Sequence, residues 1–407
     1  MKPKFTFIFL IIFSLVFAQK QRKVVFVIAD GIPFDQILTH KMHNLQKLAK
    51  TGGISEAYVG GEKNGYTETP TISAVGYNSL LTGTWVNKHN VWDNENEHQN
   101  YNYWNVFRFF KTQFPEKKIG IFSTWEDNRT KLIGQNYAEA GNLKPDYIFD
   151  GYEKDEKTFP HDEKGHFYNI IDDFVVEKAT ETIKKTAPDL SWIYLEYTDE
   201  MGHQFGDGKE FDHALDELDK RIGKLDEAVK FREKNFNEEW LVIITTDHGR
   251  DIKGFHHGSQ TNRERNTWIA TNYAEMNKYF KVQQPGIIDI TPTILRFLNV
   301  KVPQEKQFEI DGIPLIGKVS AIDLNAKLKD NQLEIFWIPI ERNGDANIYI
   351  SNTNNFKNGG KDEYQLVKKI PVDDWHTTID VSKMPSNFYK IVLEMPYNTI
   401  NRWVFVK

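Results

Sequence analysis

The chain has 407 residues, a formal net charge of −6 at pH 7 and no cysteine. This length is enough for a large α/β domain with an appendage, and an aromatic content of 14% argues against a disordered chain. The mild charge and the lack of a long basic run give no sign of a nucleic-acid-binding patch, while the missing cysteine excludes disulfides and thiolate chemistry.

Residues 1–18 have the pattern of a secretory signal peptide. Lys2 and Lys4 give a basic start, an apolar run covers residues 5–17, and the small residue Ala18 precedes the expected cleavage point. The run is short for a membrane span, so we expect none after cleavage, and an uncleaved anchor is the alternative. An exported chain without disulfides indicates a bacterial periplasmic or extracellular protein.

Strand and helix patterns alternate from residue 23 onward. Apolar, β-branched runs predict strands at residues 23–29, 118–124, 191–197, 241–246 and 267–270. Helical spacing predicts helices at residues 34–50, 77–81, 169–185 and 211–230, and one after a Thr291 cap with Pro292 at its first position. Residues 54–72 read as loop and short strand. The alternation predicts an α/β fold with a mostly parallel sheet covered by helices on both faces.

Residues 317–407 have a different pattern from the preceding domain at residues 19–316. Short alternating strands are separated there by Gly, Asn, Asp and Pro, which predicts a small C-terminal all-β sandwich. It contains no catalytic cluster, so packing against the catalytic domain and ligand binding are both open roles for it. The sequence indicates no particular oligomeric state.

Carboxylate and imidazole side chains collect where the predicted strands end, which is where chemistry gathers in open α/β sheets. They are Asp30, Asp199 and His203 in a D-x-x-x-H spacing, Asp247 and His248, and the loop residues His256 and His257. Singly, each has a plainer interpretation, such as Asp247 capping a helix or the D-x-x-x-H pair occurring by chance on a loop. Together they would serve two divalent metal ions about 4 Å apart, the arrangement that clamps a phosphoryl group. Ligation by His and carboxylate favours Zn²⁺, with Mn²⁺ or Fe as alternatives.

An ordered set of motifs extends through residues 23–316. ADG is followed by a Ser or Thr ahead of LLTG, a later His and Asn, then DEMGH, TTDHG and HHG. This set resembles the alkaline phosphatase superfamily, and most closely its nucleotide pyrophosphatase/phosphodiesterase branch and the bacterial relatives of that branch.

The resemblance implies a role for each motif residue. Its spacing to Thr82 makes Ser73 the nucleophile, and His89 and Asn94 fix this register. Asn94 would hold a phosphoryl oxygen, and a phosphoseryl intermediate would form and be hydrolysed by water. The residues implied as metal ligands are Asp30, Asp247, His248 and Ser73 for one ion, and Asp199, His203 and His257 for the other. His257 is preferred to His256 because Gly follows it.

The chain departs from this family at the nucleophile. The family diesterases read Thr-x-Pro-Asn where this chain reads Ser-Ala-Val-Gly from Ser73, so monoesterase and diesterase activity both stay open. Thr71 is the alternative nucleophile, and a helix N-cap is the plainer role for Ser73. We expect a secreted two-metal phosphoric ester hydrolase for a small phosphate ester or nucleotide-like substrate. The alternatives are a sulfatase-like hydrolase and a catalytically inactive binding protein on the same fold.

Overall fold

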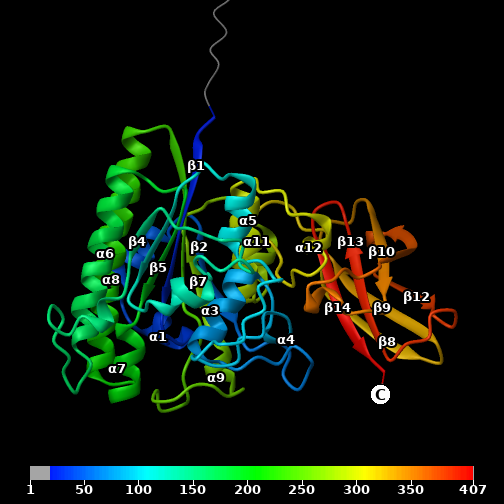
Figure 1. Ribbon diagram of the computed structural model, residues 1–407, viewed down its shortest axis with the longest axis horizontal. Helices are drawn as coiled ribbons and strands as arrows, with labels where there is room; N and C mark the ends of the chain where they lie inside the picture. Colours follow the sequence, from blue (N-terminus) through cyan, green and yellow to red (C-terminus); the bar gives the residue numbers. More distant parts are fainter. Residues whose placement is uncertain (1–18, 407) are drawn as a thin grey trace, which may run out of the picture.

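The computed structural model describes residues 19–406 and arranges them in a larger α/β part and a smaller part of antiparallel sheets (Figure 1). The predicted signal peptide at residues 1–18 lies outside the described residues. None of the helices within residues 19–406 combines the length and the apolar character that crossing a membrane requires.

A 7-stranded sheet forms the centre of the larger part. In spatial order its strands are β2 (Gly53–Tyr58), β7 (Asn266–Thr271), β6 (Glu238–Thr245), β1 (Gln21–Ala29), β5 (Leu190–Leu195), β3 (Ile119–Ser123) and β4 (Tyr147–Phe149). β7 runs antiparallel to both of its neighbours, and the other pairs are parallel. The predicted mostly parallel sheet is confirmed, with β7 as the reversed strand.

Both faces of this sheet are buried, as β1 shows by its alternation. Val24 and Phe26 belong to one core cluster, while Val25 and Val27 belong to the cluster on the opposite face. The helices packed on the first face are α3 (Ser73–Thr82), α5 (Val106–Gln113) and α11 (Ile290–Phe297). Those on the second face are α2 (His43–Leu48), α6 (Phe167–Lys185) and α8 (Lys209–Asn235). Figure 1 shows α6 and α8 on this face, at the left of the view. The predicted cover of helices on both faces is also confirmed.

Shorter helical segments fill the connections. They are α1 (Phe34–Thr39), α4 (Val86–His89), α7 (Tyr197–Phe205), α9 (Asn262–Arg265), α10 (Lys278–Val282) and α12 (Gln304–Gln307), with the π-helix η1 (Asn128–Leu132) and the 3-10 helices η2 (Tyr152–Lys154), η3 (Ile287–Asp289), η4 (Phe356–Asn358) and η5 (Val372–Asp374).

Two helix predictions were wrong in detail. The single helix expected at residues 34–50 is divided into α1 and α2, because His40 adopts an extended conformation with ψ of 137°. The helix expected after a Thr291 cap begins already at Ile290, so Thr291 does not cap it. Pro292 fits within the first turn because the backbone N–H groups there have no partner inside the helix.

The smaller part consists of two antiparallel sheets. One has the order β11 (Gln365–Pro371), β10 (Asp345–Ser351), β13 (Phe388–Glu394) and β14 (Thr399–Phe405), and the other has β12 (His376–Asp380), β9 (Gln332–Pro339) and β8 (Ala321–Lys329). The C-terminal all-β prediction is therefore confirmed. Buried Leu333 and Ile348 belong to the same cluster as Phe26 of β1, so the core continues between the parts. The division into domains at residue 316 stays a prediction.

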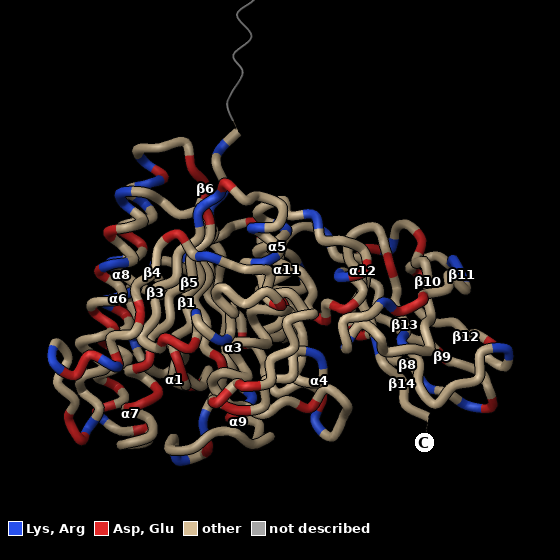
Figure 2. The backbone as a smooth tube through the Cα atoms, in the orientation of Figure 1, with Lys and Arg blue, Asp and Glu red and all other residues tan. Residues whose placement is uncertain are grey.

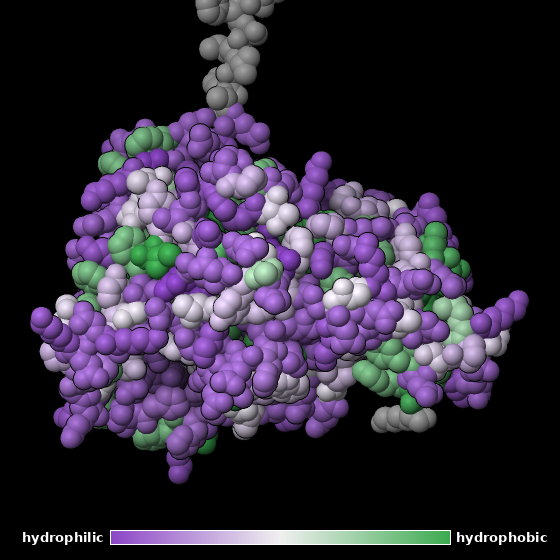
Figure 3. Space-filling view, in the orientation of Figure 1, coloured by the Kyte–Doolittle hydropathy of each residue, from purple (hydrophilic) through white to green (hydrophobic). Residues whose placement is uncertain are grey.

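The surface carries mixed charge. Acidic and basic positions are interspersed along both parts of the backbone (Figure 2). The face of the molecule seen in Figure 3 is mainly hydrophilic, with hydrophobic patches over the C-terminal sheets at the right of the view and smaller ones at the left.

Candidate metal centre

The candidate site lies at the carboxyl ends of three adjacent strands, β6, β1 and β5. Asp30 directly follows β1, and Asp247 and His248 follow β6. Asp199 and His203 come from α7, which begins two residues after β5 ends. Parallel neighbours end at one edge of a sheet, so distant parts of the sequence meet here. The alternative that Asp247 caps a helix is wrong, because no helix follows β6 directly in the described structure.

The D-x-x-x-H pair lies on a helix and not on a loop as expected. α7 places Asp199 and His203 one turn apart on the same face. The Oδ2 atom of Asp199 lies 3.2 Å from Nε2 of His203. The four-residue spacing thus brings a carboxylate and an imidazole together through helix geometry.

Asp30, Asp247 and His248 form the first donor group. Nε2 of His248 lies 3.4 Å from Oδ1 of Asp30 and 3.2 Å from Oδ2 of Asp247. All three side chains are fully buried, and their ligand atoms lie within 4.8 Å of one another.

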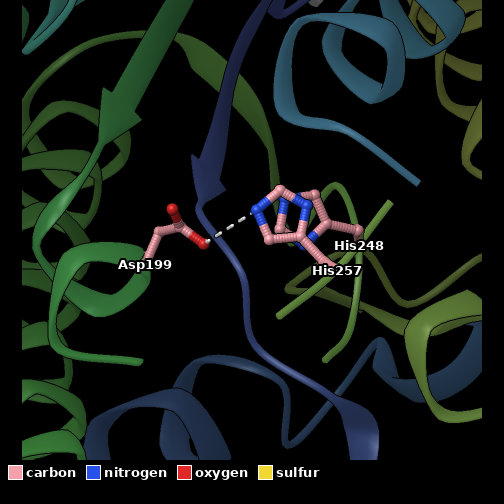
Figure 4. Close-up of side chains that lie close together, drawn as sticks. All are labelled: Asp199, His248 and His257. Atoms are coloured by element: carbon pink, nitrogen blue, oxygen red, sulfur yellow. Dashed lines mark ion pairs between the residues drawn. The ribbon is translucent and has the colours of Figure 1, made fainter. Parts of the chain in front are cut away.

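Asp199, His203 and His257 form the second donor group. Nε2 of His257 lies 3.0 Å from Nε2 of His203 and 3.9 Å from Oδ1 of Asp199. The ring of His257 stacks on the ring of His248 at a centroid distance of 3.7 Å, which joins this group to the first. Figure 4 shows the carboxylate of Asp199 facing the two stacked rings across the end of β1. His256, the alternative ligand, is exposed, and its ring lies beside that of Phe255 at a centroid distance of 6.3 Å.

Backbone carbonyls fix the tautomers of two of these histidines. Nδ1 of His248 lies 2.9 Å from the carbonyl oxygen of Gly249, and Nδ1 of His257 lies 2.9 Å from that of Thr71. A carbonyl only accepts, so each Nδ1 carries a proton, and each Nε2 presents a lone pair to the donor groups. This is the arrangement that metal-ligating histidines usually show.

The unsatisfied polar atoms of the site fit bound cations. Oδ1 of Asp30 and Oδ2 of Asp247 are buried without a hydrogen-bond donor. Burial, and then the charge of Asp199, raise the pKa of Asp30 to about 7. Burial, and then the charge of Asp30, raise the pKa of Asp247 well above its ordinary value. Crowded carboxylates and imidazole lone pairs directed at one another are costly alone and favourable around a divalent metal ion.

Ser73 is the first residue of α3 and lies beside the first donor group. Its Oγ atom is 3.2 Å from Nε2 of His248. Oδ1 of Asn94 accepts a hydrogen bond of 3.0 Å from the backbone N–H of Ala74, so Asn94 is held at the same helix end. Ile72, not Ser73, occupies the N-cap position, so the plainer N-cap interpretation of Ser73 does not apply.

The other residues singled out in the sequence lie outside these groups. The hydroxyl of Thr71 donates to the carbonyl oxygen of Ser259 at 2.8 Å and accepts from the N–H of Gly258 at 2.9 Å, so it holds the loop that carries His257. His89 is fully buried and lies 3.0 Å from Oγ of Ser79. His89 therefore packs against α3 through Ser79.

Three further groups surround Asp30, the buried Tyr77 and Tyr194 and the half-buried Glu196, and none of them was assigned to the metal site from sequence. The hydroxyls of Tyr77 and Tyr194 both donate to Oδ2 of Asp30, the latter at 2.7 Å. A carboxyl oxygen of Glu196 lies within hydrogen-bond distance of the same Tyr194 hydroxyl, and the carboxyl group lies within 4.8 Å of ligand atoms of Asp30 and Asp199. Glu196 could have been recognised as a site residue, because it lies three residues before Asp199 at the end of the same strand. Nothing in the sequence around Tyr77 indicates a contact with Asp30, since Tyr77 only fits a helical pattern.

A family model described as type I phosphodiesterase / nucleotide pyrophosphatase matches residues 24–315. Among curated proteins, the chain is similar to the 2,3-bisphosphoglycerate-independent phosphoglycerate mutase of Ehrlichia ruminantium (strain Gardel), at 25% identity over 223 residues that cover 50% of this chain and 41% of the mutase. The chain spans less than half the length of this relative.

Two solved structures extend the comparison. A 2-O GAG sulfatase has a TM-score of 0.50 and 12% identity, with 90% of this chain and 86% of the sulfatase covered. Murine ectonucleotide pyrophosphatase / phosphodiesterase 5 has a TM-score of 0.47 and 13% identity, with coverage of 69% and 96%. The likeness to the sulfatase shows a shared alkaline phosphatase-like fold.

Proposed function

Because the chain belongs to the type I phosphodiesterase / nucleotide pyrophosphatase family, we propose that it hydrolyses phosphoric esters in a metal-dependent reaction at Ser73. The observation that carries this proposal is the position of the Ser73 hydroxyl, 3.2 Å from Nε2 of His248 at the start of a helix. A helix N-terminus favours the phosphoryl anion, and the adjacent donor groups supply ligands for cations.

The two donor groups would each hold one divalent metal ion. Asp30, Asp247, His248 and Ser73 would bind one, and Asp199, His203 and His257 the other. Zinc suits a thiolate-free set of His and carboxylate ligands, with manganese or iron as alternatives. When bound, such ions would make the serine hydroxyl more acidic and stabilise charge on the leaving oxygen.

Ser73 would accept the phosphoryl group and later release it. Its hydroxyl would lose a proton as Oγ bonds to phosphorus, while the bond to the leaving oxygen breaks and the leaving group departs as an alcohol after taking up a proton. The oxygen of a water molecule would then bond to phosphorus as the Oγ–phosphorus bond of the phosphoseryl intermediate breaks, so that phosphate is released and Oγ regains a proton from that water. Because Oδ1 of Asn94 is held by the N–H of Ala74, the Nδ2 group of Asn94 is free to donate to a phosphoryl oxygen.

The substrate is proposed to be a small phosphate ester or nucleotide, as the family description suggests. Whether the protein prefers monoesters or diesters is tested by comparing the rates at which it hydrolyses both kinds of ester in the presence of zinc. Purified wild type and Ser73→Ala are offered an aryl phosphate, an aryl phosphodiester and an aryl sulfate. We expect phosphorus esters to be cleaved by wild type and the variant to lose about a thousandfold or more in kcat/KM.

The matched control is Ser79→Ala, a buried serine on the same helix whose hydroxyl donates to the carbonyl oxygen of Val75 at 2.8 Å. It should keep wild-type activity. Acid-quenched wild type should also yield a phosphorylated peptide that contains Ser73. Cleavage of the sulfate ester alone would favour the sulfatase-like alternative, and a protein that binds no divalent ion would favour the inactive binding protein.

Export to a bacterial periplasm or exterior is proposed from the basic start and apolar run within residues 1–18. The mass of the protein recovered from a cell that exports it tests this point. A mature chain that begins at Gln19 is expected, and an uncleaved Met1 start in that fraction would contradict the proposed cleavage.

A further inference from the structure

Arg250 is a fully buried arginine whose guanidinium group has an acceptor for every donor group. Nε donates to the carbonyl oxygen of Gly31 at 3.0 Å. One terminal nitrogen donates to the carbonyl oxygens of Gly254 at 3.3 Å and Phe255 at 3.2 Å. The other donates to both the carbonyl oxygen and the Oδ1 atom of Asp199.

These contacts reach every segment that carries a predicted Asp or His metal ligand. Gly31 immediately follows Asp30, and Arg250 itself lies two residues beyond His248. Asp199 belongs to α7, and Phe255 lies two residues before His257. One side chain therefore ties together the donor-bearing segments that come from β1, β5, β6 and the loop after β6.

Two glycines keep the space for this guanidinium group. A Cβ atom on Gly202 would lie 2.2 Å from Cζ of Arg250. A Cβ atom on Gly31 would lie 2.9 Å from a terminal nitrogen of Arg250 and 2.3 Å from Oδ1 of Asp199. Any larger residue at either position would displace the arginine, so the guanidinium group occupies a slot shaped for it.

We propose that Arg250 is a positioning residue that holds both metal-donor groups in their binding arrangement before any metal arrives. This inference rests on the proposed function of the same site. The guanidinium group of Arg250 donates to Oδ1 of Asp199, and Oδ2 of Asp199 then faces His203, 3.2 Å from its Nε2 atom. Side chains that orient metal ligands in this way typically change metal affinity about 10- to 100-fold when they are replaced.

Charge and geometry can be separated at this position. If Arg250 only balanced the buried carboxylates, lysine would replace it, because lysine keeps the positive charge. The ammonium group of lysine has three donors on one atom and cannot span the separate carbonyl oxygens that the planar guanidinium group reaches. Loss of affinity in Arg250→Lys is therefore the signature of positioning.

The experiment measures zinc affinity by competition with a chromophoric chelator in wild type, Arg250→Lys and Arg232→Lys. Arg232 is the matched control, since it is also buried and ion-paired, with Glu238 at the start of β6 away from the site. We expect Arg250→Lys to bind zinc about tenfold more weakly or worse, and Arg232→Lys to match wild type. In metal-free protein, the backbone amides of residues 251–258 should exchange hydrogen faster in Arg250→Lys alone.

Gly202→Ala provides a second variant if Arg250→Lys does not fold, because it disturbs the guanidinium group while keeping the arginine. It should weaken zinc binding as well. Wild-type affinity in folded Arg250→Lys or Gly202→Ala, or an equal loss in Arg232→Lys, would overturn the inference. Hydrolysis plays no part in these readouts, so a wild type that binds zinc but cleaves no phosphorus ester would refute the proposed function and leave the role of Arg250 intact.

Discussion

In two histidines of the site, a hydrogen bond from Nδ1 to a single backbone carbonyl leaves Nε2 as the nitrogen that faces the donor groups. His248 and His257 both keep a proton on Nδ1, through the carbonyl oxygens of Gly249 and Thr71. Burial is the main cause that lowers the pKa of both rings, so they are neutral at neutral pH. These two imidazoles can therefore accept a metal without first losing a proton.

His89 makes the stability of the protein depend on pH. Burial lowers the pKa of His89 from its ordinary value of 6.5 to about 3. Because the folded-state pKa lies below the unfolded value, the stability that comes from a neutral His89 is fully present above pH 6.5 and is lost as the pH falls toward 3. In His89→Gln this loss should vanish. The wild-type advantage in free energy of unfolding should therefore shrink by about 1.4 kcal/mol between pH 7.5 and pH 5.5.

Urea unfolding at both pH values, with a metal chelator present, measures this difference. His98→Gln is the control, since His98 is exposed and should give the same pH dependence as wild type. If His89→Gln lost stability toward pH 5.5 as steeply as wild type, His89 would not be the source of the acid sensitivity.

The donors of the candidate site could be predicted from sequence, while their supports could not. Asp30, Asp247 and His248 follow hydrophobic runs directly, and a parallel sheet brings such strand ends together. Tyr77 and Arg250 act through contacts with segments far away in the chain, which no local pattern encodes. The structure brings the predicted ligands together, and their binding of metal stays a prediction.

At the scale of elements, helix boundaries near the site differ most from the sequence predictions. α3 begins at Ser73, four residues before the expected start at Tyr77. The sequence pattern did not show this start, because all residues of the helix are buried and it therefore has no polar face. α7 was not predicted from the sequence, because Asp199 and His203 were interpreted as residues of a loop that follows a strand. Both errors arise where tertiary packing, rather than an alternation of polar and apolar residues, stabilises the helix.

Gly76 of α3 allows the helix to approach the end of β6 closely. A Cβ atom at this position would lie 2.8 Å from the carbonyl oxygen of Asp247 and 3.0 Å from its Cβ atom. Alanine normally stabilises a helix interior relative to glycine by up to about 1 kcal/mol. Here we expect Gly76→Ala to destabilise the protein by about 1–3 kcal/mol, since the overlap is with buried backbone that cannot rotate away.

Thermal or urea unfolding of Gly76→Ala and of a matched control tests this close approach. Gly223→Ala on α8 is suitable, because the atoms nearest to its added Cβ atom belong to the side chain of Asn44, the closest at 2.9 Å, and not to the backbone. Asn44 can shift, so the control should change stability little. A Gly76→Ala protein as stable as wild type would show that α3 and β6 have room to separate.

At the scale of the whole molecule, the sheet could be predicted but the direction of its strand β7 could not. The runs that became β1 and β6 are rich in Val and Ile, and the run that became β5 is buried throughout and mainly apolar, which identifies buried strands. The run that became β7 is short, and nothing in it marks the reversed direction that pairs it antiparallel to β2 and β6. Strand direction is set by the connections and not by the strand itself.

The contact between the α/β part and the C-terminal sheets also depends on residues that sequence patterns do not connect. Lys88 of α4 is fully buried and donates to the carbonyl oxygen of Glu309 at 2.8 Å, to Oδ1 of Asn401 at 2.8 Å and to the carboxylate of Asp311. Asn401 belongs to β14. The ammonium group thus joins α4, the connection before β8 and the last strand.

Lys88→Met removes this buried charge while keeping most of the apolar stem, and it leaves the Asp311 carboxylate without its ion pair. We expect the free energy of unfolding to fall by about 3–5 kcal/mol, as is typical when one partner of a buried pair is removed. Lys369→Met is the control, because Lys369 and Asp345 form an exposed pair at 3.2 Å whose loss should cost about 1 kcal/mol or less. Adding Asp311→Asn to Lys88→Met should recover part of the loss, since the unpaired charge is then gone. Equal losses in Lys88→Met and Lys369→Met would mean that the buried pair of Lys88 and Asp311 stabilises the protein no more than an exposed pair does.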